Sequence, residues 1–409
     1  MTGTTDRATY RDVFAVREFR ALYTTRTLSI TAFSLRILAV SVLVLTATDS
    51  PLLAGIAFGI GFFPQIVGGM FLMSLADRLR PRRALVIGGV LEALAAAVVA
   101  WPAVPAWGVL AVVGAAAIVQ PVFTAAASGL VPSLLRGDAY VLGRSVMTVT
   151  SAAAQIAGLG IGGLALALLP ARQLLLVVMI LQLLAALCAR LLLADRPPRT
   201  PEARGTVRTT WRINAALMRD PVVRGQLLAQ ALPATLVVGG EASIVAYANA
   251  TGEPDWAAGI LLAAPPLGMA LGNLAVGRLL APQTRERLSF PLLALLGAPL
   301  TVFVLQPSVW VAVPLLLLCG SGLSYELGIQ RRFLESLPDE QVGQAFGLVG
   351  TLMMSGQGLG PFLFGAVGSL ASPPVAMTAS GVSILVAAVL LRRQLIPVPV
   401  PVATRSAAP

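Results

Sequence analysis

The sequence contains no histidine, no lysine and only two cysteines. Charged residues make up 11% of its 409 residues, and hydrophobic residues make up 57%. Soluble globular proteins carry roughly a quarter of their residues as charges. A soluble chain of this length cannot cover its surface with so few charges. The deficit predicts an integral membrane protein, with lipid covering much of the molecule.

The missing residue types also exclude several kinds of site. Cys188 and Cys319 both lie in apolar runs, so neither a disulfide framework nor a metal site is predicted. Without histidine, a proton-linked step near neutral pH needs carboxylates. The chain has no Gly-x-x-x-x-Gly-Lys phosphate loop, so ATP is not expected as its energy source. We therefore expect no cofactor and no enzymatic activity.

Long apolar runs are what the sequence has instead, and its mean hydropathy is +0.84. Cutting these runs at proline, glycine and charge clusters gives twelve segments of the length that crosses a bilayer, which is about 20 residues. Each is predicted to be a helix, because an apolar run in lipid must pair its backbone groups internally. The twelve segments are 23–46, 52–75, 84–101, 106–130, 145–169, 172–193, 224–249, 256–280, 288–306, 309–329, 343–370 and 374–392.

The 29 basic residues, all arginine, are distributed unevenly between the predicted loops. If the N-terminus is cytoplasmic, the inner loops collect almost every arginine, and the outer loops hold only Arg172. The N-terminal group, counted this way, runs from Arg7 to Arg26. This is the pattern of the positive-inside rule and predicts that both termini are cytoplasmic. The net charge of +11 is therefore interpreted as a topology signal, and no nucleic-acid partner is expected.

A polar stretch with three prolines and several arginines divides the segments six and six, which is typical of a linker. The glycine pattern of residues 143–160 recurs with identical spacing at 343–360. We therefore predict an all-α membrane protein of two pseudo-symmetric six-helix bundles. Its parts are an N-terminal bundle at 1–194, a cytoplasmic linker at 195–222, a C-terminal bundle at 223–394 and a cytoplasmic tail at 395–409.

The loop after the second segment reads Gly69-Met-Phe-Leu-Met-Ser-Leu-Ala-Asp-Arg-Leu-Arg-Pro-Arg-Arg83. It resembles motif A of the major facilitator superfamily, a glycine-rich helix end followed by Asp-Arg and an arginine cluster. Met73 and Arg80 replace two of the motif's glycines, which predicts looser helix packing. The resemblance implies a latch between the two halves on the cytoplasmic side. Its residues here are Asp77, Arg78, Arg82 and Arg83.

The fifth segment contains Gly158-Leu-Gly-Ile-Gly-Gly163. This run resembles motif C, the Gly-Pro-x-x-Gly-Gly signature of drug/proton antiporters, with Leu159 in place of the proline. Simple helix packing by Gly158, Gly162 and Gly163 is the alternative, because glycine rows let membrane helices approach closely. The wider pattern is similar to actinobacterial members near the enterobactin-exporter branch of the superfamily. It includes residues 17–22, 50–54 and 343–348.

Charged side chains inside membrane segments are costly, so each indicates a role. Arg36 lies near the middle of the first segment, close to the bilayer midplane, and is predicted to bind an anion or serve coupling in a central cavity. An interhelical ion pair is the alternative. Glu241 is predicted to contact substrate or to carry a proton, which a carboxyl group in a low-dielectric site can bind and release. Glu326 is assigned equally to coupling and to an ion pair with Arg331, and Glu92 to an interhelical hydrogen bond.

Tyr247, Tyr325 and Gln155 complete the predicted substrate or coupling site. The chain is predicted to be a secondary transporter that exports small hydrophobic or amphipathic molecules, such as a drug, natural product or siderophore-like compound, in exchange for protons. The two halves would rock about a central site. An importer or uniporter of a small metabolite, and a non-transporting receptor or scaffold, are the alternatives. We expect a monomer in a bacterial plasma membrane.

Overall fold

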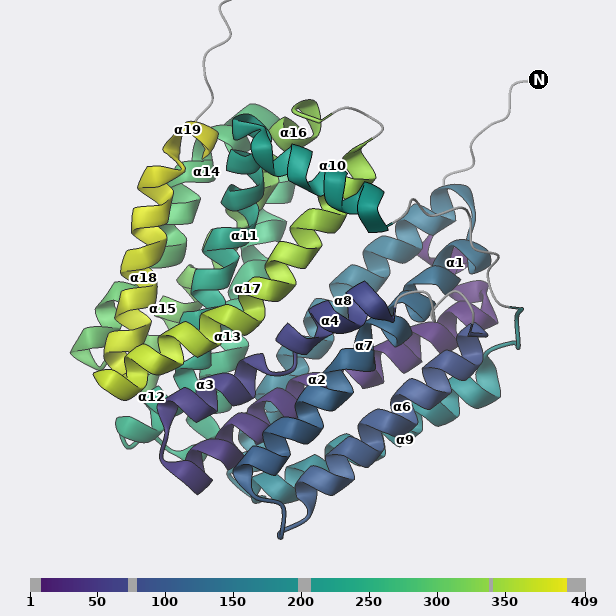
Figure 1. The fold of residues 1–409 in the computed structure, drawn as a ribbon, viewed down its shortest axis with the longest axis horizontal. Helices are drawn as coiled ribbons and strands as arrows, with labels where there is room; N and C mark the ends of the chain where they lie inside the picture. Colours follow the sequence, from purple (N-terminus) through teal and green to yellow (C-terminus); the bar gives the residue numbers. More distant parts are fainter. Residues whose placement is uncertain (1–8, 73–78, 198–206, 338–340, 396–409) are drawn as a thin grey trace, which may run out of the picture.

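The computed structural model describes residues 9–72, 79–197, 207–337 and 341–395 (Figure 1). Within these ranges the chain forms helices and no strand, which confirms the predicted all-α class. Eleven segments are long and apolar enough to cross a membrane. The remaining predicted segment, 343–370, corresponds to α17 (Val342–Leu370), a helix of 29 residues. The predicted arrangement of two six-helix bundles is confirmed.

The N-terminal bundle holds the first six segments. Its second segment is broken between Gly59 and Phe63, where glycines precede Pro64, whose ring cannot continue the helical hydrogen bonding. A short helix, α1 (Tyr10–Ala15), precedes the bundle. The segments are α2 (Arg17–Thr48), α3 (Pro51–Gly59) with α4 (Phe63–Phe71), α6 (Pro81–Ala100), α7 (Ala106–Leu134), α8 (Gly137–Leu166) and α9 (Ala171–Leu192).

The C-terminal bundle repeats this plan, with breaks in three of its segments. Pro299 opens a 3-10 stretch, η1, that replaces the last turns of α14. The segments are α11 (Pro221–Ala242) with α12 (Ile244–Ala250), α13 (Asp255–Leu279), α14 (Pro282–Gly297) with η1 (Ala298–Leu305), α15 (Val309–Gly322) with η2 (Leu323–Tyr325) and α16 (Glu326–Glu335), then α17 and α18 (Pro373–Leu390). The short α19 (Arg392–Leu395) follows.

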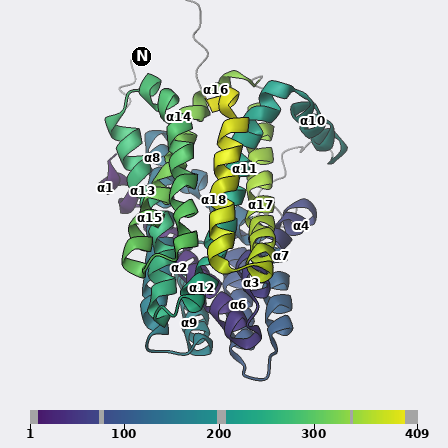
Figure 2. The ribbon, with the colours of Figure 1, turned by 90° about the vertical axis from the view of Figure 1, so that its left-hand side faces the viewer.

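The stretch predicted as a linker contains a helix of its own, α10 (Val207–Arg219). Leu217 of this helix is buried in a cluster with Phe333 and Val349 of the C-terminal bundle. The amide nitrogen of Gln344 donates a hydrogen bond of 2.7 Å to the side-chain oxygen of Asn214. The described part of the linker is therefore packed on the C-terminal bundle, where α10 lies across its end (Figures 1 and 2).

The two bundles have unlike ends. We call the end with α1, α10, α16 and α19 the terminal end, and the end with α12 and the start of α3 the loop end (Figures 1 and 2). The bundles lie closest toward the loop end and diverge toward the terminal end (Figure 1). The most extensive contacts between them are those of α8 with α13 and of α3 with α17, and α4 also contacts α17. A substrate site of the predicted kind would therefore lie between or beside these helices.

Candidate functional site

The contacts between the bundles depend on glycine. A Cβ atom on Gly163 of α8 would lie 2.3 Å from the Cα of Gly259 on α13, closer than real Cβ contacts. A Cβ on Gly55 of α3 would lie 2.6 Å from the carbonyl oxygen of Pro361 on α17. Gly163 is in the last turn of α8 and Gly55 in the first turns of α3, so both contacts lie toward the loop end. Backbones can approach this closely only where side chains are absent.

The glycine run of α8 also packs inside its own bundle. A Cβ on Gly158 would lie 2.8 Å from the carbonyl oxygen of Thr31 on α2, and one on Gly162 would lie 2.7 Å from a methyl carbon of Leu35. Gly160 differs, because only the Cβ of Ala263 lies near it, at 3.9 Å. The run therefore contacts α2 with one face and α13 of the other bundle with another.

A polar cavity of about 290 Å³ lies beside α2, α7 and α8. Its lining includes Arg26, Ser128, Tyr140, Arg144, Met147 and Ser151. The hydroxyl oxygen of Tyr140 accepts a hydrogen bond of 3.4 Å from Arg144. Gln155, which the sequence predicts at the site, is exposed and follows Ser151 by one helical turn on the same face of α8.

A second cavity of about 370 Å³ lies between the bundles and is mostly apolar. Gln65, Ile66 and Gly69 of α4, Pro121 of α7, and Gly347, Gly350, Thr351 and Met354 of α17 line it. A Cβ atom on Gly69, Gly347 or Gly350 would meet nothing within 4 Å. Unlike the glycines toward the loop end, these three leave open space on either side of the interface.

Arg36 and Glu92 form a buried ion pair between α2 and α6. The guanidinium nitrogen lies 2.8 Å from one carboxylate oxygen, and the two side chains are 4% and 7% exposed. Arg36 also lies 5.3 Å from the ring centroid of Phe33. The other carboxylate oxygen of Glu92 has no hydrogen-bond partner among the described residues. The structure thus places Arg36 inside the N-terminal bundle, and its predicted role in coupling stays a prediction.

The two other carboxylates proposed for coupling both lie in the C-terminal bundle. Glu241, one residue from the end of α11, and Glu326, at the start of α16, are half-buried. Neither makes a hydrogen bond or ion pair with the part of the chain that the structure describes. Arg331, considered as a partner of Glu326, instead lies 2.6 Å from Glu286 on α14.

Tyr247 and Tyr325 are fully buried and each hydroxyl donates to a backbone carbonyl. Tyr247 donates to Pro307 at 2.6 Å, and Tyr325 donates to Ala229 of α11 at 2.8 Å. These bonds hold neighbouring segments of one bundle together. Neither tyrosine lines the two cavities described above, so the predicted contact with substrate stays a prediction.

Replacing Tyr325 with phenylalanine is expected to lower the free energy of unfolding by about 0.5–1.5 kcal/mol, the net value of one hydrogen bond. The change leaves the packing volume nearly intact. Thermal melting of the purified protein in detergent measures the loss. An unchanged midpoint would show that the bond to Ala229 does not contribute to stability.

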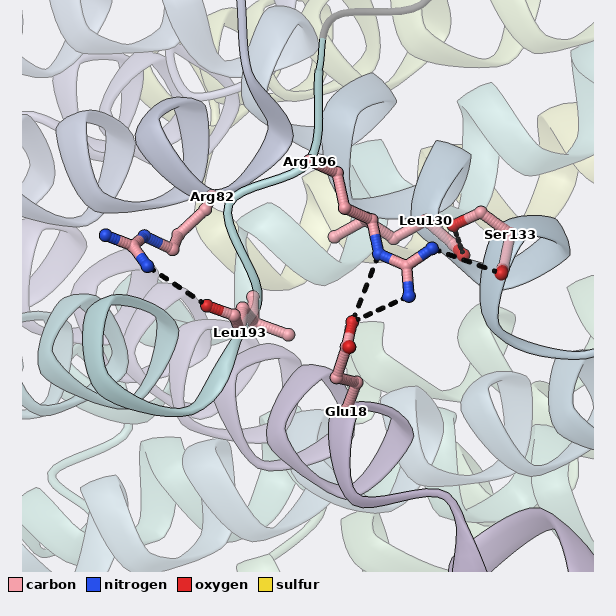
Figure 3. Close-up of polar contacts among 6 residues, drawn as sticks. All are labelled: Glu18, Arg82, Leu130, Ser133, Leu193 and Arg196. Atoms are coloured by element: carbon pink, nitrogen blue, oxygen red, sulfur yellow. Dashed lines mark hydrogen bonds and ion pairs between the residues drawn. The ribbon is translucent and has the colours of Figure 1, made fainter.

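The described basic residues of motif A, which include Arg82 and Arg83, lie at the terminal end of the N-terminal bundle. Asp77 and Arg78 lie outside the described residues. Arg82 donates to the carbonyl oxygen of Leu193 at 3.4 Å, at the end of α9 (Figure 3). Arg83 is exposed on the first turn of α6. The described part of the predicted latch therefore contacts its own bundle.

Residues after α9 extend this network across the bundle. Arg196 lies 3.0 Å from a carboxylate oxygen of Glu18 on α2 and donates to the carbonyl of Ser133 on α7 (Figure 3). Arg80 lies 2.6 Å from Asp195, and this hydrogen bond holds the pKa of Asp195 below its ordinary value. The contact is therefore complete above the ordinary pKa of aspartate and is lost only as the pH falls through the lowered one.

The sequence interpretation missed several of these residues. Arg26 was counted among the topological charges, yet it lines the 290 Å³ cavity. Its only signal was its position, three residues inside the first predicted segment. Ser128, Tyr140 and Ser151 carried no signal, because single hydroxyls are common in membrane helices.

Twelve membrane helices in two bundles, meeting at glycine contacts beside polar and apolar cavities, define a membrane transporter. The sequence profile of the Major Facilitator Superfamily matches residues 22–334. The chain belongs to this superfamily, whose members carry small molecules across membranes.

Among curated proteins, the chain is similar to the enterobactin exporter EntS of Escherichia coli, at 35% identity over 136 residues. EntS of Shigella flexneri matches over the same length at 34% identity. The match to the E. coli protein covers 32% of this chain and 32% of the relative, so it spans about a third of each.

Two solved structures show the same fold at low sequence identity. A bacterial homolog of the human lysosomal transporter Spinster, in an inward-facing and unoccupied conformation, aligns with a TM-score of 0.72 and 16% identity, covering 96% of this chain and 100% of that one. The nucleoside transporter NupG aligns with a TM-score of 0.71 and 13% identity, covering 92% and 98%. At these identities the likeness concerns the fold alone.

Proposed function

We propose that the protein is a proton-coupled exporter of small hydrophobic or amphipathic molecules that works by alternating access. The observation that carries this proposal is the contrast between the two kinds of glycine. Gly163 and Gly55 close the bundles against each other toward the loop end, whereas Gly347 and Gly350 leave a cavity open between them. Such an arrangement can reverse by rocking one bundle against the other.

The arginine pattern supports an orientation. Arg80, Arg136, Arg196 and Arg331 all lie at or near the terminal end, and the positive-inside rule assigns that end to the cytoplasm. The conformation described here is then the inward-facing one, with its cavities available to cytoplasmic molecules. The similarity to enterobactin exporters, which are bacterial, supports export across a bacterial plasma membrane.

Glu241 is the proposed proton carrier, because it is half-buried in the membrane and lacks a counter-ion among the described residues. Glu241→Gln is expected to abolish the dependence of export on the pH gradient while substrate binding persists. Proton movement is measured in inverted membrane vesicles with an imposed pH gradient. A pH-sensitive dye reports it as amphipathic compounds are added one at a time. The matched control is Glu335→Gln, an exposed carboxylate on α16 that lies 3.7 Å from Arg331. Gradient dependence that survives Glu241→Gln would exclude this residue as the carrier.

Gly350→Leu is expected to block transport without impairing folding, because the new side chain enters the open cavity rather than a neighbouring helix. Gly268→Leu provides the contrast, since a Cβ there would lie 2.1 Å from the carbonyl oxygen of Leu317. Size-exclusion elution in detergent reports folding, and export from vesicles reports function. Normal export by Gly350→Leu would show that this cavity is not on the substrate path.

A further inference from the structure

Arg26 has no counter-charge among the side chains that the structure describes. It lies on α2 in the N-terminal bundle, is half-buried, and makes no ion pair or hydrogen bond with the residues that the structure describes. Arginine in the membrane ordinarily pairs with a carboxylate or reaches the headgroup region. Arg26 makes no such pair with the described residues, in a bundle whose other arginine on α2 within the membrane segment, Arg36, has Glu92.

Two cavities meet at Arg26. It lines the cavity of about 290 Å³ and also a smaller one of about 40 Å³, which reaches inward to Glu92 and Gln182. The smaller cavity has room for water molecules and contains two buried oxygens without partners, Thr25 Oγ1 and Glu92 Oε1. Water there can hydrate one side of the guanidinium while its other side faces the larger cavity.

The charges beside these cavities do not balance. Arg26 and Arg36 contribute two positive charges, and Glu92 contributes the one carboxylate among the described lining residues of both cavities. Arg144 also lines the larger cavity and has contacts of its own. Because Glu92 is paired with Arg36, Arg26 is left without a counter-charge among the described side chains, and an anionic group entering the larger cavity would neutralise it.

The larger cavity has the donors and the size for such a group. The hydroxyls of Ser128 and Tyr140 line it together with Arg26, whereas the hydroxyl of Ser151 already donates to the carbonyl oxygen of Met147. An aromatic ring needs a cavity of about 150 Å³, so 290 Å³ holds a ring with a carboxylate attached. Met147 and Val131 provide apolar wall for the ring.

We propose that this cavity binds the anionic group of the transported molecule, and that the substrates are amphipathic organic acids held by Arg26. The proposal rests on the proposed function for its direction, but binding itself requires no gradient. It narrows the substrate class from amphipathic molecules in general to those carrying a carboxylate or a similar oxyanion.

The test is equilibrium binding of naphthoate and of its uncharged counterpart naphthamide to the full chain in nanodiscs of phosphatidylcholine. Wild type is expected to bind naphthoate at least about tenfold more tightly than naphthamide, through charge-assisted hydrogen bonds. Arg26→Gln is expected to remove that difference, and Arg26→Lys to retain part of it. Arg136→Gln, an exposed arginine outside both cavities, is the matched control and should bind like wild type.

Equal binding of acid and amide by wild type, or unchanged preference in Arg26→Gln, would overturn the proposal. Size-exclusion elution shows whether Arg26→Gln is folded, and Arg26→Lys keeps the test valid if it is not. A parallel measurement in phosphatidylglycerol nanodiscs distinguishes a lipid phosphate from a soluble acid. If this lipid abolishes naphthoate binding, the site is a lipid site and the proposal fails. Loss of naphthoate binding would overturn this proposal but would not contradict export of uncharged molecules. Loss of export with intact naphthoate binding would instead contradict the proposed direction of transport.

Discussion

Gly163→Ala is expected to reduce transport at least tenfold. Its Cβ would lie 2.3 Å from the Cα of Gly259, so α8 and α13 must move apart toward the loop end. Overpacking of a tight interface costs about 1–3 kcal/mol, and about 1.4 kcal/mol changes an equilibrium tenfold. The conformation with the loop end closed is destabilised by that free energy relative to the conformation with the loop end open. The transport cycle therefore stalls with the loop end open.

Electron–electron distance measurements between spin labels test this directly. Labels at Arg136→Cys and Glu335→Cys, both exposed toward the terminal end of different bundles, need only Cys188 and Cys319 to be replaced first. Gly163→Ala should shift the population toward shorter distances as the terminal end closes. Gly160→Ala is the matched control, because the nearest atom to its Cβ lies 3.9 Å away. Identical distance distributions in both variants would contradict the proposed role of this contact.

Arg36→Ala is expected to lower the free energy of unfolding by about 3–5 kcal/mol, because it leaves the carboxylate of Glu92 buried and unpaired. The loss should appear as a large drop in the thermal midpoint of the purified protein. Wild type and the variant are both expressed at low temperature, which favours folding of a destabilised chain.

The double variant Arg36→Met with Glu92→Leu distinguishes the stability contributed by the ion pair from the cost of leaving one charge unpaired. Replacing both charges by apolar side chains of similar volume removes the buried charge and is expected to restore most of the lost stability. Arg172→Ala is a control, since this arginine lies in the first turn of α9 and donates to the backbone carbonyls of Val99, Trp101 and Val104 rather than to a buried carboxylate. A single Arg36→Ala variant that melts like wild type would show that the ion pair does not stabilise the bundle.

Hydropathy and the arginine pattern predicted the twelve segments because both report on the bilayer, which acts on every residue in the same way. Neither signal locates the breaks within segments, such as the one before Pro64, because neighbouring helices can satisfy the freed backbone groups. They also missed α10, since its short polar sequence, preceded by prolines, is typical of a linker and its buried Leu217 depends on tertiary contacts.

The site was harder to predict than the fold. The sequence singled out Arg36 by its depth, but depth does not show which neighbour a side chain faces, and Glu92 on α6 turned out to be that neighbour. Arg26 has no such distinction in depth, and only the three-dimensional arrangement shows that it lines two cavities without a counter-ion. Residue pairing between helices is a tertiary property that hydropathy does not encode.

Accumulation of a panel of amphipathic compounds in a host that lacks its own efflux pumps tests the central claim most directly. Cells producing wild type are compared with cells producing Gly163→Ala, with and without a protonophore. Proton-driven export by alternating access predicts that cells producing wild type accumulate less of the compounds than cells producing Gly163→Ala. The protonophore is expected to raise accumulation in the cells producing wild type. Higher accumulation in cells producing wild type would contradict export and indicate uptake instead.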